Sequence, residues 1–258
     1  FSRIQFTPDL LPSDITGSTV FKEGTGEFEF NEGPIFSNIV LADEINRAPP
    51  KTQSALLEVM EETQVTVNNT THSVPSPFFV IATQNPIEQE GTFELPESQR
   101  DRFIIKTAIG YPDRAAERDL LDRRIQRRRS TPRVEQAIES GVFETMQEVP
   151  EYVHVEPTVR DYIIDVGRAT RKHEGTEIGV SPRGIQRLLE ASRARAVLRG
   201  REFAIPDDIK ALAIPVFAHR IVLSSEAMVG GTTREEIIEA VLDEISVPAM
   251  DTTELSPS

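Results

Sequence analysis

Two short apolar runs with an amphipathic segment between them stand out in the first part of the chain. The runs occupy residues 39–42 and 78–82, and each is typical of a strand buried on both faces of a parallel sheet. Between them, Pro49-Pro50 precedes apolar residues at helical spacing, which predicts a helix. Residues 102–108 predict a third core strand. The pattern indicates an α/β fold.

Two further segments predict β-hairpins. In residues 18–36 a Gly-Thr-Gly turn at 24–26 separates two alternating apolar and polar stretches. In residues 64–74 the polar turn at 68–71 separates two further short strand-like stretches. We therefore expect two hairpins beside the sheet.

After Pro112 the apolar period changes to that of helices. Thr233 and Glu236 have the spacing of a capping box ahead of the last of them. The expected helices cover 116–125, 159–166, 185–196 and 237–245.

This change of period places a domain boundary near Pro112. We expect an α/β core over 1–112, a helical domain over 113–247 and a flexible polar tail over 248–258.

Composition excludes several kinds of chemistry. The chain has no Cys, which rules out disulfides, thiol nucleophiles and iron–sulfur clusters. Its 28 Lys and Arg against 42 Asp and Glu give a net charge of −14, which disfavours nucleic acid as a partner. The arginine-rich run at 123–129 ends a predicted helix, where the dipole favours cations, so it does not change this expectation. Without a signal peptide pattern or a long apolar span, a cytoplasmic protein is expected.

Two adjacent carboxylates follow the first apolar run. Asp43 and Glu44 stand at the carboxyl end of the predicted strand, the edge of a parallel sheet where ligands bind. One carboxylate can hold a hydrated Mg²⁺ while the next orients a water for attack on a phosphate, as in a Walker B motif. A solvated strand end followed by a turn explains the pair equally well.

Asn85 and Arg102 stand where a nucleotide site would use them. Asn85 follows the second apolar run, and its amide can hold an attacking water or a terminal phosphate, although an Asn-Pro pair is ordinarily a turn. Arg102 begins the third predicted strand. It is either a partner for Asp101 or an arginine finger that reaches a neighbouring subunit.

Arg183 occupies an unusual place for a cation. Ser181 has the character of an N-cap and Pro182 that of a first helical residue, so Arg183 falls in the first turn, where the helix dipole disfavours positive charge. A bound anion would explain it, because backbone N–H groups and the guanidinium would converge on one phosphate. An exposed Arg at little cost is the simpler alternative.

Four stretches of the chain, in this order and spacing, resemble the MoxR family of AAA+ ATPases, and the match continues to His219-Arg220-Ile221. The stretches are 7–17 (TPDLLPSDITG), 41–53 (LADEINRAPPKTQ), 82–86 (ATQNP) and 181–183 (SPR). The resemblance implies a P-loop NTPase-like αβα core followed by an all-α lid, and subunits arranged in a ring, expected to be a hexamer. It also implies ATP hydrolysis that drives chaperone-like remodelling or assembly of client proteins, and a partner that carries a von Willebrand factor A domain.

The family's functional residues fall on residues already singled out. Asp43 would coordinate Mg²⁺, Glu44 would activate water, and Asn85 would act as sensor 1. Arg183 would be sensor 2 and Arg102 the arginine finger. In the family the position of Arg100 is usually apolar, so Arg100 is the alternative finger. The two predicted hairpins would correspond to the helix-2 insert and the pre-sensor-1 hairpin, which face the ring pore or the client.

The sequence departs from the family at one essential point, because no G-x-x-x-x-G-K-[ST] occurs in it. In the family this Walker A loop lies just upstream of the segment that matches residues 1–6. The resemblance therefore implies an incomplete stretch of a longer ATPase that lacks a central strand, between those ending at Asn85 and Ala108. The alternatives are a non-catalytic ring or partner-binding module that has lost nucleotide binding, or a magnesium-chelatase-like AAA+ subunit.

Overall fold

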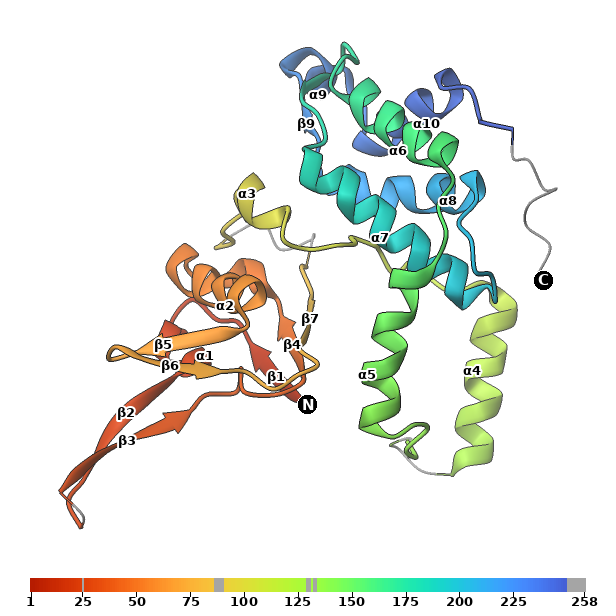
Figure 1. Cartoon of the computed structure of the whole chain (residues 1–258). Coiled ribbons are helices and arrows are strands. Elements are labelled where there is room, and N and C mark those ends of the chain that lie inside the picture. Colours follow the sequence, from red (N-terminus) through yellow and green to blue (C-terminus); the bar gives the residue numbers. More distant parts are fainter. Residues whose placement is uncertain (25, 86–90, 129–130, 132–133, 250–258) are drawn as a thin grey trace. The chain divides into compact units, whose positions relative to one another are not determined.

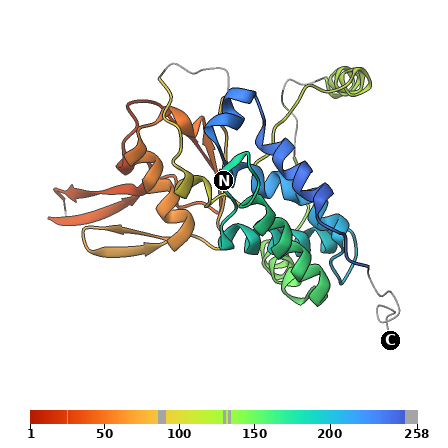
Figure 2. The same cartoon turned by 90° about the horizontal axis from the view of Figure 1, so that it is seen from above.

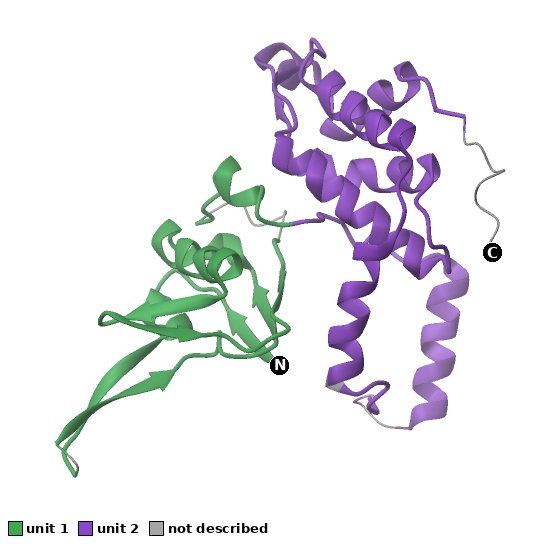
Figure 3. Ribbon diagram, in the orientation of Figure 1, with its two compact units in different colours: residues 1–103 green, residues 104–258 purple. Residues whose placement is uncertain are grey.

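A computed structural model describes residues 1–24, 26–85, 91–128, 131 and 134–249 of the chain. The chain divides into two compact units, Phe1–Phe103 and Ile104–Ser258 (Figure 3). Each unit has its own apolar core.

Unit 1 is built on a three-stranded parallel sheet in the order β1-β4-β7 (Figure 1). The strands β4 (Ile39–Asp43) and β7 (Phe79–Ala82) confirm the two that the apolar runs predict. Sequence analysis missed β1 (Ser2–Gln5), which pairs with β4 so that Gln5 lies opposite Asp43. The signal was present, because buried Ile4 and Phe6 alternate with exposed polar residues at a period of two.

The two faces of this sheet differ. On one face Ile4, Val40 and Ala42 are buried in the same core cluster as Leu56 and Leu57 of α2 (Pro50–Glu62). The α1 helix (Pro12–Thr16) packs against α2, and the 3-10 helix η1 (Ile45–Arg47) leads from β4 toward it. On the other face the strands carry exposed apolar side chains, which are Ile39, Phe79 and Ile81. The helix predicted after Pro49 is confirmed, with Pro50 as its first residue.

Both predicted hairpins are confirmed. The first is β2 (Gly17–Lys22) with β3 (Glu27–Glu32), and the second is β5 (Gln64–Val67) with β6 (Thr70–Ser73). Asn68 and Asn69 form the second turn, and both have the positive φ that a tight two-residue hairpin turn requires.

The hairpins lie side by side (Figures 1 and 2). The rings of Phe30 and His72 stack with their centroids 4.1 Å apart, and Asn68 Nδ2 donates to Thr19 Oγ1 at 3.0 Å.

The third predicted strand is wrong. Residues 97–100 form the short helix α3 (Glu97–Arg100), and 102–108 are irregular. A strand needs a paired edge, and within the described residues the sheet ends at β7. The Lys106 amide donates instead, at 2.9 Å, to the carbonyl of Pro215 in the last turn of α8 (Pro206–Phe217), where helix carbonyls lack intrahelical partners.

Unit 2 is helical, as the apolar period predicts. Its core is a cluster of buried side chains that includes the fully buried Leu188, Ile209, Phe217 and Ile237. Besides α8, the helices are α4 (Arg114–Arg127), α5 (Ser140–Glu148), η2 (Val149–Tyr152), α6 (Pro157–Thr170), α7 (Pro182–Leu198), η3 (Ala218–Arg220), α9 (Ser225–Gly230) and α10 (Arg234–Glu244). A small ribbon of β8 (Thr176–Ile178) and β9 (Val222–Leu223) completes it.

Two features of these helices stand out. The capping box is confirmed, because Thr233 Oγ1 accepts from Glu236 N at 3.2 Å and Glu236 Oε2 accepts from Thr233 N at 2.7 Å. The helix predicted over 116–125 is α4, but its Leu120, Leu121 and Ile125 are exposed.

Among the described residues, none of the helices combines the length and apolarity that a bilayer crossing requires. The predicted tail lies, from residue 250 on, outside the described residues.

Candidate functional site

The carboxyl edge of the sheet holds Asp43 in a defined geometry. Asp43 Oδ1 accepts a hydrogen bond from Thr83 Oγ1 at 2.5 Å. Asp43 Oδ2 accepts from Arg3 Nε at 3.1 Å and from Arg3 Nη2 at 2.5 Å. The Thr83 hydroxyl, and after it the Arg3 guanidinium, lower the pKa of Asp43 below its ordinary value of 3.8. Asp43 is therefore an ionised carboxylate at neutral pH.

The backbone turns at Glu44, directly after the last residue of β4. Its backbone is left-handed, with φ 56° and ψ 48°, which is uncommon for a residue other than glycine. The Glu44 amide donates to Thr83 Oγ1 at 2.9 Å, and this bond holds the turn. Glu44 Oε2 accepts from Gln5 Nε2 at 2.7 Å and from Arg47 Nη1 at 3.1 Å. Both bonds use the same oxygen, Oε2.

Sequence analysis missed the three residues that organise this edge, which are Thr83, Arg3 and Gln5. Thr83 follows Ala82, which pairs with Ala42, so the register of β7 places the Thr83 hydroxyl beside Asp43. Arg3 and Gln5 are two residues apart on β1 and share one face of the sheet. Only the pairing of β1 with β4 brings them to the carboxylates.

The structure places the other predicted residues as follows. Asn85 is half-buried and lies two residues beyond Thr83, at the same edge as Asp43 and Glu44. Arg102 forms an ion pair with Glu61 of α2 at 3.0 Å, and Arg100 is the last residue of α3.

Arg183 lies in unit 2. Ser181 Oγ accepts from Gly184 N at 3.1 Å and Pro182 is the first residue of α7, so the predicted helix start is confirmed and Arg183 is in the first turn. The aliphatic part of Arg220, a buried side chain, passes against Gly184, where an added Cβ would lie 2.9 Å from Arg220 Cδ. The stem of Arg220 therefore packs against this helix start, while its Nη1 donates to the carbonyls of Ile104 and Val216.

Comparisons with known proteins agree with this architecture. Residues 1–105 match the ATPase family associated with various cellular activities (AAA), and residues 168–241 match the AAA lid domain. The chaperone MoxR1 of Mycobacterium tuberculosis is 42% identical over 260 residues, which cover 97% of this chain and 68% of MoxR1. The chain belongs to the MoxR family of AAA ATPases. The resemblance seen in the sequence motifs is confirmed, as is the α/β core with a parallel sheet followed by a helical lid.

Two further proteins match over nearly the whole chain. The uncharacterized protein YeaC of Bacillus subtilis is 46% identical over 248 residues, which cover 96% of this chain and 77% of YeaC. The crystal structure of a putative ATPase from Cytophaga hutchinsonii superimposes with a TM-score of 0.88 at 39% identity, covering 96% of this chain and 78% of that one.

The donor set of this MoxR-family edge suits Mg²⁺ better than a metal that needs a protein cage. Among the described residues, no group of three or more His, Cys, Asp or Glu side chains could enclose a metal ion. Mg²⁺ is commonly held by one or two carboxylates with waters and substrate phosphates. Ionised Asp43 fits that role, whereas no phosphate-cradling loop occurs in the 258 residues.

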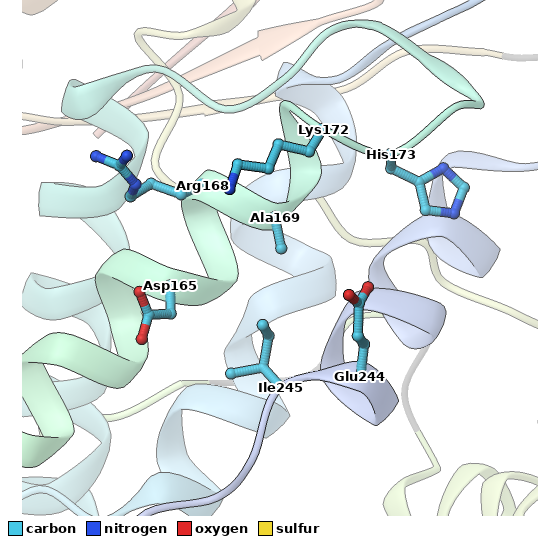
Figure 4. A pocket seen from close by; sticks show the side chains of 7 residues that line it. All are labelled: Asp165, Arg168, Ala169, Lys172, His173, Glu244 and Ile245. Atoms are coloured by element: carbon cyan, nitrogen blue, oxygen red, sulfur yellow. The ribbon is translucent and has the colours of Figure 1, made fainter.

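A separate pocket of about 230 Å³ lies in unit 2 between the ends of α6 and α10 (Figure 4). It contains none of the predicted site residues. Its lining mixes charges of both signs and consists of Asp165, Arg168, Ala169, Lys172, His173, Glu244 and Ile245. We place the candidate site at the sheet edge, where the ionised carboxylate lies.

Proposed function

We propose that this MoxR-family protein is a Mg²⁺-dependent ATP hydrolase that remodels or assembles partner proteins. The observation that carries the proposal is the pair of carboxylates at the carboxyl edge of β4. Asp43 is held ionised by Thr83, and Glu44 is turned away from the strand by a hydrogen bond to the same hydroxyl. Family membership and the name of the relative MoxR1, a chaperone, support the wider function.

Each residue has a separate task in this proposal. Asp43 would hold Mg²⁺, which neutralises charge on phosphate oxygens when it is bound. Glu44 would accept the proton of the attacking water through Oε1, while Gln5 and Arg47 keep Oε2 in place. The Asn85 amide would orient that water or the terminal phosphate.

The arginines would act on the phosphates of ATP. Arg183, in the first turn of α7, would contact a phosphate of ATP through its guanidinium. Arg102, or Arg100 in its place, would act on the nucleotide of a neighbouring subunit in a ring, which we propose to be a hexamer. A protein client and a partner with a von Willebrand factor A domain complete the proposal. The proposed hydrolysis requires a phosphate-binding loop in addition to these residues.

The test starts with the intact mass of the native protein, followed by ATP turnover of that species. Replacing Glu44 by Gln keeps the shape and removes the base, so we expect turnover to fall by about 10²-fold or more. Glu58→Gln is the matched control, because Glu58 is an exposed carboxylate on α2. Turnover unchanged by Glu44→Gln would refute the role of Glu44.

A non-catalytic ring or partner-binding module is the second candidate. It is favoured by the absence of the phosphate-loop motif from the sequence. It predicts that the native species shows no ATP turnover and that Glu44→Gln leaves partner binding unchanged. Titration of the 258-residue chain with ATP is expected to show weak binding or none, and tight Mg²⁺-dependent binding would contradict that expectation.

A further inference from the structure

The two oxygens of Asp43 are occupied in different ways. Oδ1 is bound by the Thr83 hydroxyl, which is itself held by the backbone amide of Glu44. Oδ2 is bound by two nitrogens of one guanidinium, that of Arg3. The Thr83 side of the carboxylate is therefore anchored to the backbone, and the Arg3 side depends on a long side chain that is 59% exposed.

A metal ion and Arg3 need the same oxygen. Mg²⁺ binds carboxylate oxygens, and Oδ1 is already directed by the Thr83 hydroxyl, which the Glu44 amide holds in place. Oδ2 carries the exposed Arg3 side chain, which donates two charge-assisted hydrogen bonds to it, so a metal ion that binds Oδ2 meets Arg3 there. Two cations on one oxygen repel each other, so binding of one requires that the other leave.

We propose that Arg3 is an intramolecular counter-ion of Asp43 that must be displaced before Mg²⁺ binds. The inference rests on the proposed function, because it takes Asp43 as the metal-binding residue. Arg3 thereby sets the metal affinity of the edge and keeps Asp43 from being an unpaired charge when no metal is present.

The surrounding contacts show what the displacement changes. Arg3 Nη2 also donates to Gln5 Oε1 at 3.2 Å, and Gln5 Nε2 donates to Glu44 at 2.7 Å. When Arg3 leaves, the Gln5 amide loses one of its two partners. Arrival of the metal at Asp43 is thus linked through Arg3 and Gln5 to the hydrogen bonding of Glu44.

The test measures metal binding without turnover. Mn²⁺ chloride is titrated into the full 258-residue chain, and the paramagnetic broadening of the amide resonances of residues 41–45 reports occupancy. Arg3→Gln is expected to lower the Mn²⁺ concentration at half-broadening about two- to fivefold, the range expected from loss of an exposed ion pair. Arg3→Lys, which keeps the charge but loses the two-nitrogen fork, is expected to fall between wild type and Arg3→Gln.

The matched control is Arg47→Gln, because Arg47 is a second arginine of this edge and forms its ion pair with Glu44. It removes the same charge from the same edge, so an equal gain in Arg47→Gln and Arg3→Gln would show a general charge effect and overturn the proposal. An unchanged half-broadening concentration in Arg3→Gln would also overturn it. Broadening that persists in Asp43→Asn would place the metal elsewhere, and would refute the metal site of the proposed function as well.

Discussion

The helical unit and the sheet unit bury their apolar side chains to different extents. In unit 2, Phe217 and Ile237 are 0% exposed and several helices meet around them. In unit 1, Phe79 and Ile81 on β7 are 54% and 45% exposed, although strands of parallel sheets are usually covered on both faces. The lid therefore has a closed core, whereas the sheet has one covered face and one open face.

The candidate site lies at the end of the open face. Leu41 and Asp43 alternate with buried Val40 and Ala42, and Arg3 lies opposite Leu41. Side chains on that face meet solvent, so Arg3 and Asp43 can exchange partners without opening a packed core. The comparison indicates that the candidate site lies where packing is least complete.

The strongest test of this contrast compares two phenylalanines. Phe217→Ala opens a cavity in a closed core and is expected to lower the free energy of unfolding by about 3 to 5 kcal/mol. Phe79→Ala removes a side chain that is more than half exposed and is expected to change it by no more than about 0.5 kcal/mol. Urea unfolding followed by circular dichroism measures both. Equal losses would show that the face of β7 is covered in solution.

A second test compares two paired carboxylates. Buried Asp208 accepts from Arg201 at 2.9 and 2.7 Å and from the Ile205 amide at 3.0 Å, whereas Asp43 is paired at the surface. Asp208→Asn is expected to destabilise unit 2 by about 2 to 3 kcal/mol, below the full cost of breaking a buried pair because Arg201 is partly exposed. Asp43→Asn is expected to change stability by less than about 1 kcal/mol. Thermal unfolding of the two variants separates a structural carboxylate from the one proposed to bind a metal ion, and a larger loss for Asp43→Asn would reverse this assignment.

The smallest expected effects concern two carboxylates that threonines stabilise. The Thr83 hydroxyl is the main cause that lowers the pKa of Asp43, whereas the backbone amide of Thr233 is the main cause that lowers the pKa of Glu236. Thr83→Val therefore removes the main cause of the lowered pKa at Asp43. Thr233→Val removes only the side-chain hydrogen bond, which is the lesser cause of the lowered pKa at Glu236. Carboxyl NMR titration is expected to show the larger pKa rise at Asp43, and a larger rise at Glu236 would contradict these causes.

The pH dependence of stability has a definite sign at Asp43. Its folded pKa lies below the ordinary value of 3.8, so its contribution is fully present above that value and is lost as pH falls through the folded pKa. Thr83→Val brings the folded pKa closer to 3.8 and is expected to weaken this acid dependence. Unfolding measured between neutral pH and the acid range checks the sign.

Much of the fold was predictable because its signals are local. The apolar runs of β4 and β7, the turn of Asn68 and Asn69 and the Ser181-Pro182 helix start all act over a few residues. The strand predicted over 102–108 failed because a strand is completed only by a neighbour, and apolar composition alone does not supply one.

The candidate site also has a part that local sequence patterns predict and a part that depends on tertiary structure. Asp43 and Glu44 could be singled out from the chain alone, because two carboxylates after a buried run are a local pattern. Their partners could not, because strand register is set by hydrogen bonds between segments about 40 residues apart. The pairing of β1 and β7 with β4 decided that Arg3 and Thr83 share Asp43 and that Gln5 reaches Glu44. Residue type and spacing thus determined which groups are available for chemistry, and tertiary pairing decided which of them meet.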